Sequence, residues 1–394
     1  MSEPVRIVLY SHDSTGLGHV RRNLSLAHHL ALALPRLTGR PVAGLLATGL
    51  PQASRFPLPE GFDWLALPGV TKGEGGYRPR HLDASMESLV DLRSHLLETA
   101  LLRFAPDLVV VDRHPFGVRK ELRRPLKKLR RRRPETRVVL GLREVLDAPK
   151  VAAREWADLG DQELLAGLVD EVWVYGDRSV HDPAATGELP PALARRVRYT
   201  GYLAHGRDLN PPPSRWDANV PFVLTTVGGG SDGADVARVA AAAPVPEGHE
   251  HLVVTGPQMS AEDRAAVRAA AAPGALVVES ASGLSPHITT ASAVVSMGGY
   301  NSVCEILATD TPALVVPRET PRTEQLIRAR DLATAGALDV LREPYLTPAA
   351  IGTWLAHAVV RRIDRSLIQR DGLTTVPHLA AQLLAVDNNL EVVA

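Results

Sequence analysis

Short apolar runs recur along the chain, and stretches with helical periodicity separate most of them. The runs show no strict alternation of apolar and polar positions, which is typical of parallel strands buried on both faces. Strands that alternate with helices in this way predict an α/β fold. We expect the clearest strands at residues 5–10, 41–48, 108–112, 138–142, 170–175, 222–227, 251–255, 275–278, 294–296 and 313–316.

A proline-rich stretch divides the chain into two parts. Asn210 is followed by Pro211, Pro212, Pro213 and Ser214, and prolines form stiff spacers that cannot continue a helix. We therefore predict a first domain over residues 1–208, a linker over 209–219 and a second domain over 220–365. Helical periodicity then resumes over 366–385, within a C-terminal segment over 366–394.

A strand, a glycine turn, a helix and another strand follow one another over residues 294–316. Gly298 and Gly299 form the turn, and they are candidate binding positions because no side chain keeps a ligand away from their backbone. Asn301 or Ser302 is positioned to cap the helix, which runs to about residue 309. The free N–H groups and positive dipole end of such a helix start form a site for an anion such as phosphate.

Polar side chains follow this anion site at spacings that suit a nucleotide sugar. Glu305 lies four residues after Asn301 on the same helix face, where a carboxylate suits the two hydroxyls of a ribose. Glu324 and Gln325 open a further helix and offer polar groups to sugar hydroxyls. The structural alternative is an ordinary strand-turn-helix unit with a capping asparagine and a surface glutamate.

The residues of this unit resemble the donor box of GT-B glycosyltransferases. They are Gly299, Tyr300, Asn301, Ser302, Glu305, Pro312, Pro317, Glu324 and Gln325. The resemblance is closer to the MurG-like N-acetylglucosaminyltransferases than to the plant-type enzymes, since Met297 stands where the plant-type box opens with histidine. The interval from Pro317 to Glu324 is also nearer to the MurG-like spacing.

This resemblance implies a role for each polar residue of the box. It implies that Asn301 and Ser302 hold the diphosphate, that Glu305 binds the ribose, and that Glu324 with Gln325 binds the donor sugar. A further glycine loop, with Gly229, Gly230 and Ser231, opens the second domain and resembles the Gly-Gly-Ser-x-Gly loop of MurG-like proteins. That likeness implies backbone contacts to phosphate or sugar at these three residues.

A glycine loop also follows the first strand. Gly16 and Gly18 precede His19 just before a helix expected over residues 21–34. Dinucleotide sites have a third glycine, but Arg21 stands in its place here. The loop resembles the first loop of MurG-like transferases and, more closely, the Gly-His-Val-x-Arg loop of a nucleotide-sugar hydrolase of pseudaminic acid biosynthesis. Gly16 and Gly18 are therefore candidate donor contacts.

His19 is the candidate general base. A neutral imidazole takes a proton from an attacking hydroxyl or water near physiological pH. Asp112 ends a strand, which is where ligands bind in open α/β sheets, and resemblance to plant-type transferases implies that it pairs with His19. Helix capping or packing is the alternative for His19, and a salt bridge or a helix cap is the alternative for Asp112. Arg143 and Glu144 are candidates by position alone.

Composition narrows the function classes. Lysine plus arginine equals aspartate plus glutamate at 44 each in 394 residues, which disfavours a nucleic-acid binder driven by overall charge. Cys304 is the single cysteine, so neither a disulfide framework nor a cysteine zinc site can form. The chain has no Asp-x-Asp pair to hold a diphosphate on a metal. We therefore expect no metal and no cofactor besides the nucleotide-sugar co-substrate.

Two features bear on location. The N-terminus enters a strand without a signal-peptide pattern, and no apolar run approaches the roughly 18 residues of a membrane span, so we expect a soluble, cytoplasmic protein. The segment from Arg119 to Arg133 is densely basic. A solvated helix face is the default interpretation, and peripheral contact with an anionic lipid surface or a phosphorylated acceptor is the alternative.

Together these features predict two Rossmann-like domains facing each other across a cleft, in the GT-B arrangement, with the last helix crossing back onto the first domain. The predicted function is inverting, metal-independent transfer of a sugar from a nucleoside diphosphate sugar, with UDP favoured, to an acceptor hydroxyl. Three alternatives use the same fold: a nucleotide-sugar hydrolase in which His19 activates water, a non-hydrolysing epimerase, and a non-catalytic nucleotide-sugar-binding subunit.

Overall fold

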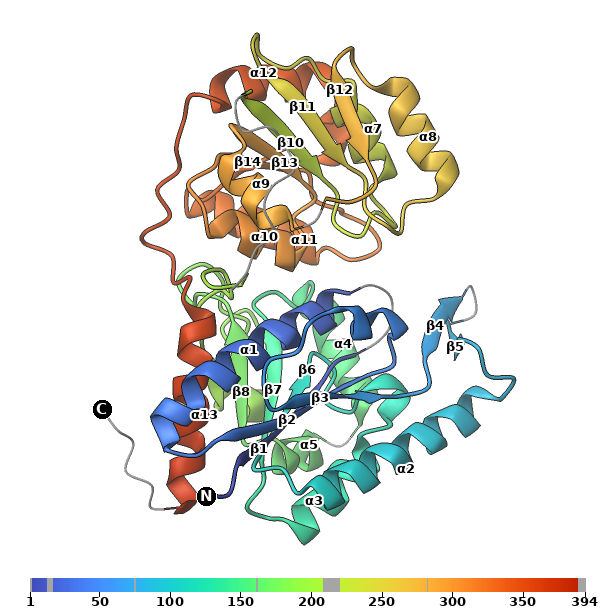
Figure 1. Cartoon of the computed structure of the whole chain (residues 1–394), viewed down its shortest axis with the longest axis vertical. Coiled ribbons are helices and arrows are strands. Elements are labelled where there is room, and N and C mark those ends of the chain that lie inside the picture. Colours follow the sequence, from blue (N-terminus) through green and yellow to red (C-terminus); the bar gives the residue numbers. More distant parts are fainter. Residues whose placement is uncertain are drawn as a thin grey trace.

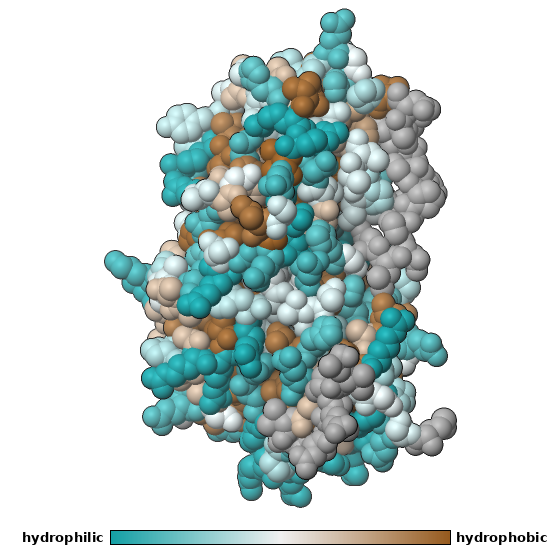
Figure 2. Space-filling model, turned by 90° about the vertical axis from the view of Figure 1, so that its left-hand side faces the viewer, coloured by the Kyte–Doolittle hydropathy of each residue, from teal (hydrophilic) through white to brown (hydrophobic). Residues whose placement is uncertain are grey.

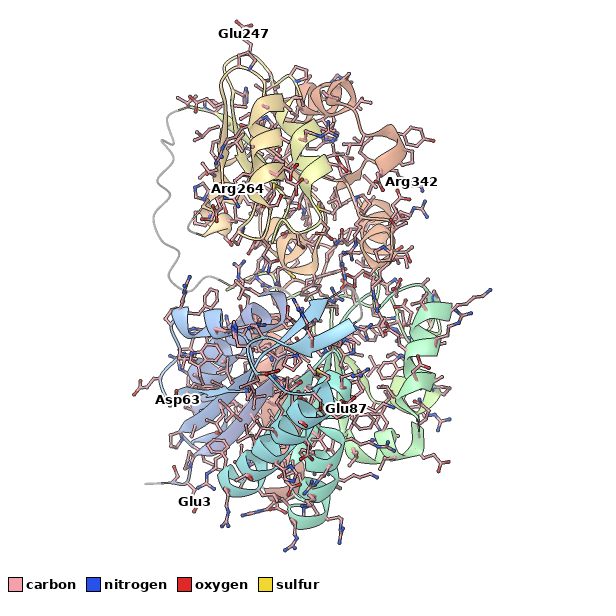
Figure 3. All side chains as sticks on the ribbon, turned by 90° about the vertical axis from the view of Figure 1, so that its right-hand side faces the viewer. Glu3, Asp63, Glu87, Glu247, Arg264 and Arg342 are labelled. Carbon is pink, nitrogen blue, oxygen red and sulfur yellow. The ribbon has the colours of Figure 1, made fainter. Side chains whose placement is uncertain are left out.

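The computed structural model describes residues 2–12, 17–73, 76–160, 162–207, 220–281 and 283–388. Within these residues the chain forms a seven-stranded sheet from its first half and a six-stranded sheet from its second half. Each sheet forms a separate α/β unit with its own helices, and Figure 1 shows the unit of the second half above that of the first. Glu247 lies at one end of the molecule, in the second half of the chain, and Glu3 lies in the part formed by the first half (Figure 3).

The first sheet is parallel throughout. Its central strands are largely buried, and β6, with the sequence LVVVD, is buried along its whole length, because helices cover both faces. In spatial order the strands are β3 (Phe62–Ala66), β2 (Val42–Thr48), β1 (Val5–Tyr10), β6 (Leu108–Asp112), β7 (Arg137–Arg143), β8 (Glu171–Tyr175) and β9 (Val197–Tyr199). The α/β prediction is confirmed for this half.

Helices and one hairpin complete the first half. The antiparallel hairpin, β4 (Val70–Gly73) with β5 (Gly76–Pro79), stands apart from the main sheet. The helices are α1 (Gly18–Thr38), α2 (Met86–Phe104), α3 (Arg123–Arg132), α4 (Pro149–Leu159), α5 (Gln162–Leu168) and α6 (Pro191–Ala194), with short 3-10 helices η1 (Pro51–Arg55) and η2 (Val118–Lys120).

The second sheet is also parallel throughout. In spatial order its strands are β12 (Ala275–Val278), β11 (Glu250–Val254), β10 (Phe222–Thr226), β13 (Ala293–Ser296), β14 (Ala313–Val315) and β15 (Asp339–Val340). Its helices are α7 (Ala234–Ala241), α8 (Ala261–Ala270), α9 (Leu284–Thr290), α10 (Tyr300–Leu307), α11 (Glu324–Thr334) and α12 (Pro348–Ala358), with the 3-10 helix η3 (Glu343–Tyr345).

The last helix, α13 (Gly372–Asn388), packs beside α1 in the first half of the molecule (Figure 1). We expected this helix to begin at residue 366, and it begins six residues later. Residues 366–368 form a turn instead. The chain that follows pairs with the first domain, where Tyr202 N–H donates to Gln369 O at 2.8 Å and His205 N–H donates to Arg370 O at 3.1 Å. The predicted linker at 209–219 lies outside the described residues, and the domain boundaries stay a prediction.

Two helices near the site begin earlier than the sequence predicted. Helix α1 begins at Gly18 rather than at residue 21, so His19 and Arg22 lie on the same turn. Helix α10 has Gly299 as its N-cap, and no side chain caps it. The prediction that Asn301 or Ser302 caps the helix is therefore wrong, because the chain turns at Gly298, with φ +76°, and the N-cap falls two residues before Asn301.

Buried polar contacts join the two domains. Arg328 of α11 donates to Glu144, just beyond β7, at 2.7 Å from Nε, and both side chains are fully buried. His181 of the first domain lies 2.7 Å from Asp331 of α11 and 2.6 Å from Glu188. Burial alone would lower the pKa of His181, but its hydrogen bonds to these two carboxylates raise that pKa to about 9.

His181→Gln should lower the free energy of unfolding in a pH-dependent way. Because the pKa of His181 is raised on folding, its stabilisation is complete below the unfolded-state pKa of about 6.5 and is lost as the pH rises. We expect a loss on the order of 2 kcal/mol at pH 6, fading above about pH 9. Urea unfolding of both proteins at several pH values measures it.

His205→Gln is the matched control for this prediction. His205 also pairs with an aspartate, Asp371, at 2.7 Å, but the two side chains are 40% and 70% exposed. Exposed pairs contribute little to stability, so this variant should unfold almost as the wild type does. A loss in His181→Gln that is the same at pH 6 and pH 10 would contradict the prediction.

Candidate functional site

A cavity of about 330 Å³ lies between the two domains. The start of α1 contributes to it from the first domain, and the loop after β10 and the start of α10 contribute from the second. The predicted residues that line it are Gly18, His19, Gly229, Ser231, Gly299, Asn301, Ser302 and Glu305. The structure thus brings residues from all three predicted glycine loops to one place.

The other predicted residues lie around the cavity rather than in its lining. Gly230 has φ +89° and turns the loop after β10 close to the Thr255 carbonyl. A Cβ at Gly298 would lie 2.6 Å from Cγ1 of Val315 in the neighbouring strand. Both glycines therefore allow their loops to pack closely against neighbouring protein atoms, and neither lines the cavity. Gly16 lies outside the described residues.

The first turn of α10 faces the cavity. The N–H groups of such a turn have no partners within the helix, and the dipole makes this end positive. The Asn301 side chain joins the domains here, because its amide donates to Gly18 O at 3.1 Å and its oxygen accepts from Arg207 at 2.8 Å. Asn301 therefore fixes the two glycine loops relative to each other instead of capping its own helix.

Glu305 lies one turn further along α10 and is buried. Its carboxylate accepts from Arg21 of α1 at 3.2 Å. The predicted ribose-binding residue and the arginine that replaces the third glycine therefore face each other across the cavity. The Glu305 carboxylate and the Arg21 guanidinium thus lie in the cavity one helical turn beyond the start of α10.

Glu324 and Gln325 do not line the cavity. Glu324 accepts from Arg143, a cavity residue of the first domain, at 2.5 and 3.3 Å. Burial alone would raise the pKa of Glu324, but Arg143 above all lowers it to about 2, so Glu324 is ionised. The Gln325 side-chain oxygen accepts from the backbone N–H of Arg318 at 3.1 Å. Both side chains are thus hydrogen-bonded within the protein, Glu324 to the side chain of Arg143 and Gln325 to the backbone of Arg318.

His19 and Asp112 are in contact, as the resemblance implied. Nδ1 of His19 lies 2.7 Å from Oδ2 of Asp112, and Asp112 is fully buried. A neutral imidazole that donates from Nδ1 to the carboxylate keeps Nε2 as a proton acceptor. The salt-bridge alternative for Asp112 also holds, because Arg22 donates to Oδ1 at 2.8 Å and to Oδ2 at 2.7 Å.

The electrostatics of this group leave His19 neutral. Burial lowers the pKa of His19, Asp112 acts to raise it, and Arg22 and Arg143 lower it further, so that the net shift is downward. Burial would raise the pKa of Asp112, but Arg22 and then His19 hold it far below its usual range. The group therefore contains an ionised carboxylate, a guanidinium that balances its charge, and an unprotonated imidazole.

Three arginines of the cavity had no predicted role or only a positional one. Arg22 lies three residues after His19, a spacing that places two side chains side by side once the helix is known to begin at Gly18. Arg143 was a candidate from the strand end alone. Arg21 stands where a dinucleotide site has its third glycine, and no role was predicted for it. Their partners lie in distant segments, so local sequence offered no signal for the contacts.

In the described part of the chain, no group of three histidine, cysteine, aspartate or glutamate side chains is arranged to hold a metal ion. No helix there is long and apolar enough to cross a bilayer. On the face shown in Figure 2, hydrophilic residues predominate and hydrophobic ones lie in separate small groups.

The fold is that of the GT-B proteins. Crystal structures with this fold match nearly the whole chain at low identity. MurG from Acinetobacter baumannii is 15% identical with a TM-score of 0.57, covering 97% of this chain and 100% of its own. A UDP-glucosyltransferase from Polygonum tinctorium is 14% identical with a TM-score of 0.60, covering 98% and 99%. A UDP-N-acetylglucosamine 2-epimerase is 11% identical with a TM-score of 0.62, covering 99% and 98%.

Residues 224–364 match the glycosyltransferase family 28 C-terminal domain. No curated protein sequence shows significant similarity to the chain. The GT-B prediction and the resemblance to MurG-like transferases in the second domain are confirmed. The chain therefore has the GT-B fold, its residues 224–364 are similar to the family 28 C-terminal domain, and these findings support a glycosyltransferase.

The turn before α10 requires glycine at position 298, and this requirement can be tested by substitution. Gly298→Ala should lower the free energy of unfolding by about 2 kcal/mol or more, because φ is +76° and the new Cβ would lie 2.6 Å from the stiff side chain of Val315. Gly274→Ala is the control, since φ is +85° there but nothing lies within 4 Å. Equal losses in denaturant unfolding would show that the contact with Val315 does not matter.

Proposed function

We propose that the protein is an inverting, metal-independent glycosyltransferase that uses a nucleoside diphosphate sugar, with UDP as the nucleotide. One observation carries the proposal. A neutral histidine bonded to a buried aspartate at 2.7 Å lines the same cavity as the start of α10 and Glu305. A proton acceptor therefore faces an anion site and a carboxylate suited to ribose, and both domains contribute.

The donor would lie along the second-domain wall. The loop at Gly229 and Ser231 and the first turn of α10 offer backbone N–H groups, which suit the diphosphate. Glu305, one turn further, accepts hydrogen bonds and suits the ribose hydroxyls. Leu284 at the start of α9 lines the same wall and gives an apolar surface for the base.

The reaction is a single displacement at the anomeric carbon. The acceptor oxygen forms the new bond, the bond to the diphosphate oxygen breaks, and the acceptor proton moves to Nε2 of His19. One displacement inverts the configuration. The imidazolium that results is stabilised by Asp112, while the start of α10 faces the negative charge that develops on the leaving diphosphate. Closer approach of the two domains around the bound substrates would exclude water from the cavity.

A nucleotide-sugar hydrolase is the second candidate. The observation that favours it is the contact pattern of the Gly18-His19-Val20-x-Arg22 loop, whose histidine and arginine both bond to Asp112. The same donor site would serve, and His19 would take its proton from water. A third candidate, a non-catalytic nucleotide-sugar-binding subunit, would leave His19 without a chemical role.

The basic segment around α3 is partly neutralised. Arg124 and Lys128 pair with Glu98, and Arg130 pairs with Asp170. Arg131 and its neighbours up to residue 133 are exposed. A cytoplasmic location with peripheral contact of this segment to an anionic surface stays a prediction.

Glu305→Ala tests the donor site by calorimetry. Binding of UDP should weaken at least tenfold, about 1.4 kcal/mol, because the ribose hydroxyls lose their acceptor. Binding of 2′,3′-dideoxy-UDP, which lacks those hydroxyls, should change little. Glu319→Ala is the control, since Glu319 pairs with Arg342 away from the cavity. Equal weakening of both nucleotides would contradict the ribose role, and preferred binding of GDP would contradict UDP as the nucleotide.

His19→Ala tests the chemistry. Release of UDP from UDP-glucose or UDP-N-acetylglucosamine should fall about 10²–10⁴-fold, while calorimetric binding of UDP stays within about twofold. The wild type is assayed with and without a panel of alcohols, phenols and methyl glycosides. A sugar product formed only with an acceptor supports the transferase, and free sugar at a rate that no acceptor changes supports the hydrolase. Turnover that persists in His19→Ala would exclude His19 as the base.

A further inference from the structure

Arg22 joins His19, the candidate base, and Asp112 to form a group of three side chains. Its Nε and Nη2 donate to Oδ1 of Asp112 at 3.2 and 2.8 Å, and Nη2 also donates to Oδ2 at 2.7 Å. The same Nη2 lies 3.1 Å from Nδ1 of His19. Arg22 is 2% exposed, so this guanidinium holds the carboxylate from a fixed, dry position. All three residues belong to the first domain.

Tyr300 brings the second domain into this group. It is the first residue of α10 and is 3% exposed. Its ring centroid lies 5.5 Å from the Arg22 guanidinium carbon and 5.7 Å from that of Arg328, whose partner is the buried Glu144. Cations at this distance over an aromatic ring are attracted to it, most strongly when both are desolvated. The ring therefore supports two buried guanidinium groups.

The Tyr300 hydroxyl fixes the ring within the first domain. It donates to the Tyr175 carbonyl at 2.8 Å, at the end of β8, and accepts from the Leu203 N–H at 3.4 Å. The ring also stacks on Tyr202, with centroids 6.4 Å apart. One side chain of the second domain thus contacts the first domain at several points, and one of them is the arginine that holds Asp112.

We propose that Tyr300 couples the contact between the two domains to the formation of the base: its ring holds Arg22 against Asp112, and this arrangement positions His19 as the proton acceptor. The inference rests on the proposed function in taking His19 as the base. Arg22 and Tyr300 are positioning residues in this scheme. When the donor-side domain moves away, the ring leaves Arg22 and the base is no longer prepared, which protects the donor from water while the domains are apart.

The direction of the effect follows from the groups that face His19. They are Asp112 from β6, Arg22 from α1, Arg143 from β7, His12 after β1 and His114 after β6. The ring centroid of His12 lies 5.8 Å from that of His19 and 4.4 Å from that of His114. Burial lowers the pKa of His19, Asp112 raises it, and the two arginines lower it. An Arg22 that is no longer held leaves the carboxylate uncompensated, so the pKa of His19 rises.

The test is an NMR pH titration of histidine-labelled full-length protein without substrate, with the His19 signals identified from His19→Gln. In the wild type we expect His19 to titrate below its ordinary value of about 6.5. In Tyr300→Leu we expect an upward shift of about one unit or more, because the ring that holds Arg22 is gone. Tyr300→Met, which fills the space with a flexible apolar chain, gives a second measurement if the leucine variant does not fold.

Two further variants grade the effect. Tyr300→Phe keeps the ring but loses the hydroxyl that fixes it, so its His19 titration should shift less than that of Tyr300→Leu. Tyr202→Phe removes a buried hydroxyl that has no hydrogen-bond partner among the described residues, and it keeps the stacked ring, so it should change nothing. An unshifted His19 in folded Tyr300→Leu or Tyr300→Met, or an equal shift in Tyr202→Phe, would overturn the coupling.

Kinetics separate failure of this inference from failure of the proposed function. With UDP-glucose or UDP-N-acetylglucosamine, the acidic limb of the kcat profile should move upward in Tyr300→Leu by the same amount as the His19 titration. The KM for the donor should change much less than kcat. If the His19 titration shifts in Tyr300→Leu but neither the wild type nor any variant turns over a UDP sugar, the proposed function fails and the coupling stands. If turnover needs His19 but the titration does not shift, only the coupling fails.

Discussion

The position of one domain relative to the other depends on charges buried between them. Arg328 and Glu144 meet at 2.7 Å with both side chains fully buried, and Arg143 meets Glu324 at 2.5 Å beside the cavity. A buried charge without its partner is costly, so the domains dock where all of these pairs close together. This docking brings the start of α10 opposite His19 and so defines the cavity.

The same pairs determine what a donor would meet. Glu305 and Glu324, which the sequence assigns to ribose and to sugar, each bond to an arginine of the first domain. In the proposed function, the ligand hydroxyls donate to the same two carboxylates, either beside the arginines or in their place. Binding of the donor and contact between the domains are therefore linked. Arg21 and Arg143 line the cavity from the first domain, opposite the start of α10.

The sequence by itself determined the local parts of this protein. Buried runs without alternation predicted the strands of both parallel sheets, because residues within one strand share one environment. The Gly298 turn and the four-residue spacing of Asn301 and Glu305 predicted the wall of the cavity for the same local reason. The end of a strand at Asp112 predicted its place at the edge where ligands bind, and the contact with His19 followed from resemblance.

Only the tertiary structure decided how these parts are used. Asn301 bonds to Gly18, 283 residues away, rather than capping its own helix. Glu324 faces Arg143 instead of the cavity, across a separation of 181 residues. Arg22 joins Asp112 and rests against a ring of the other domain. These contacts depend on where two separately folded sheets meet, and the angle at which they meet is set by desolvated charge pairs that no local period or turn signal records.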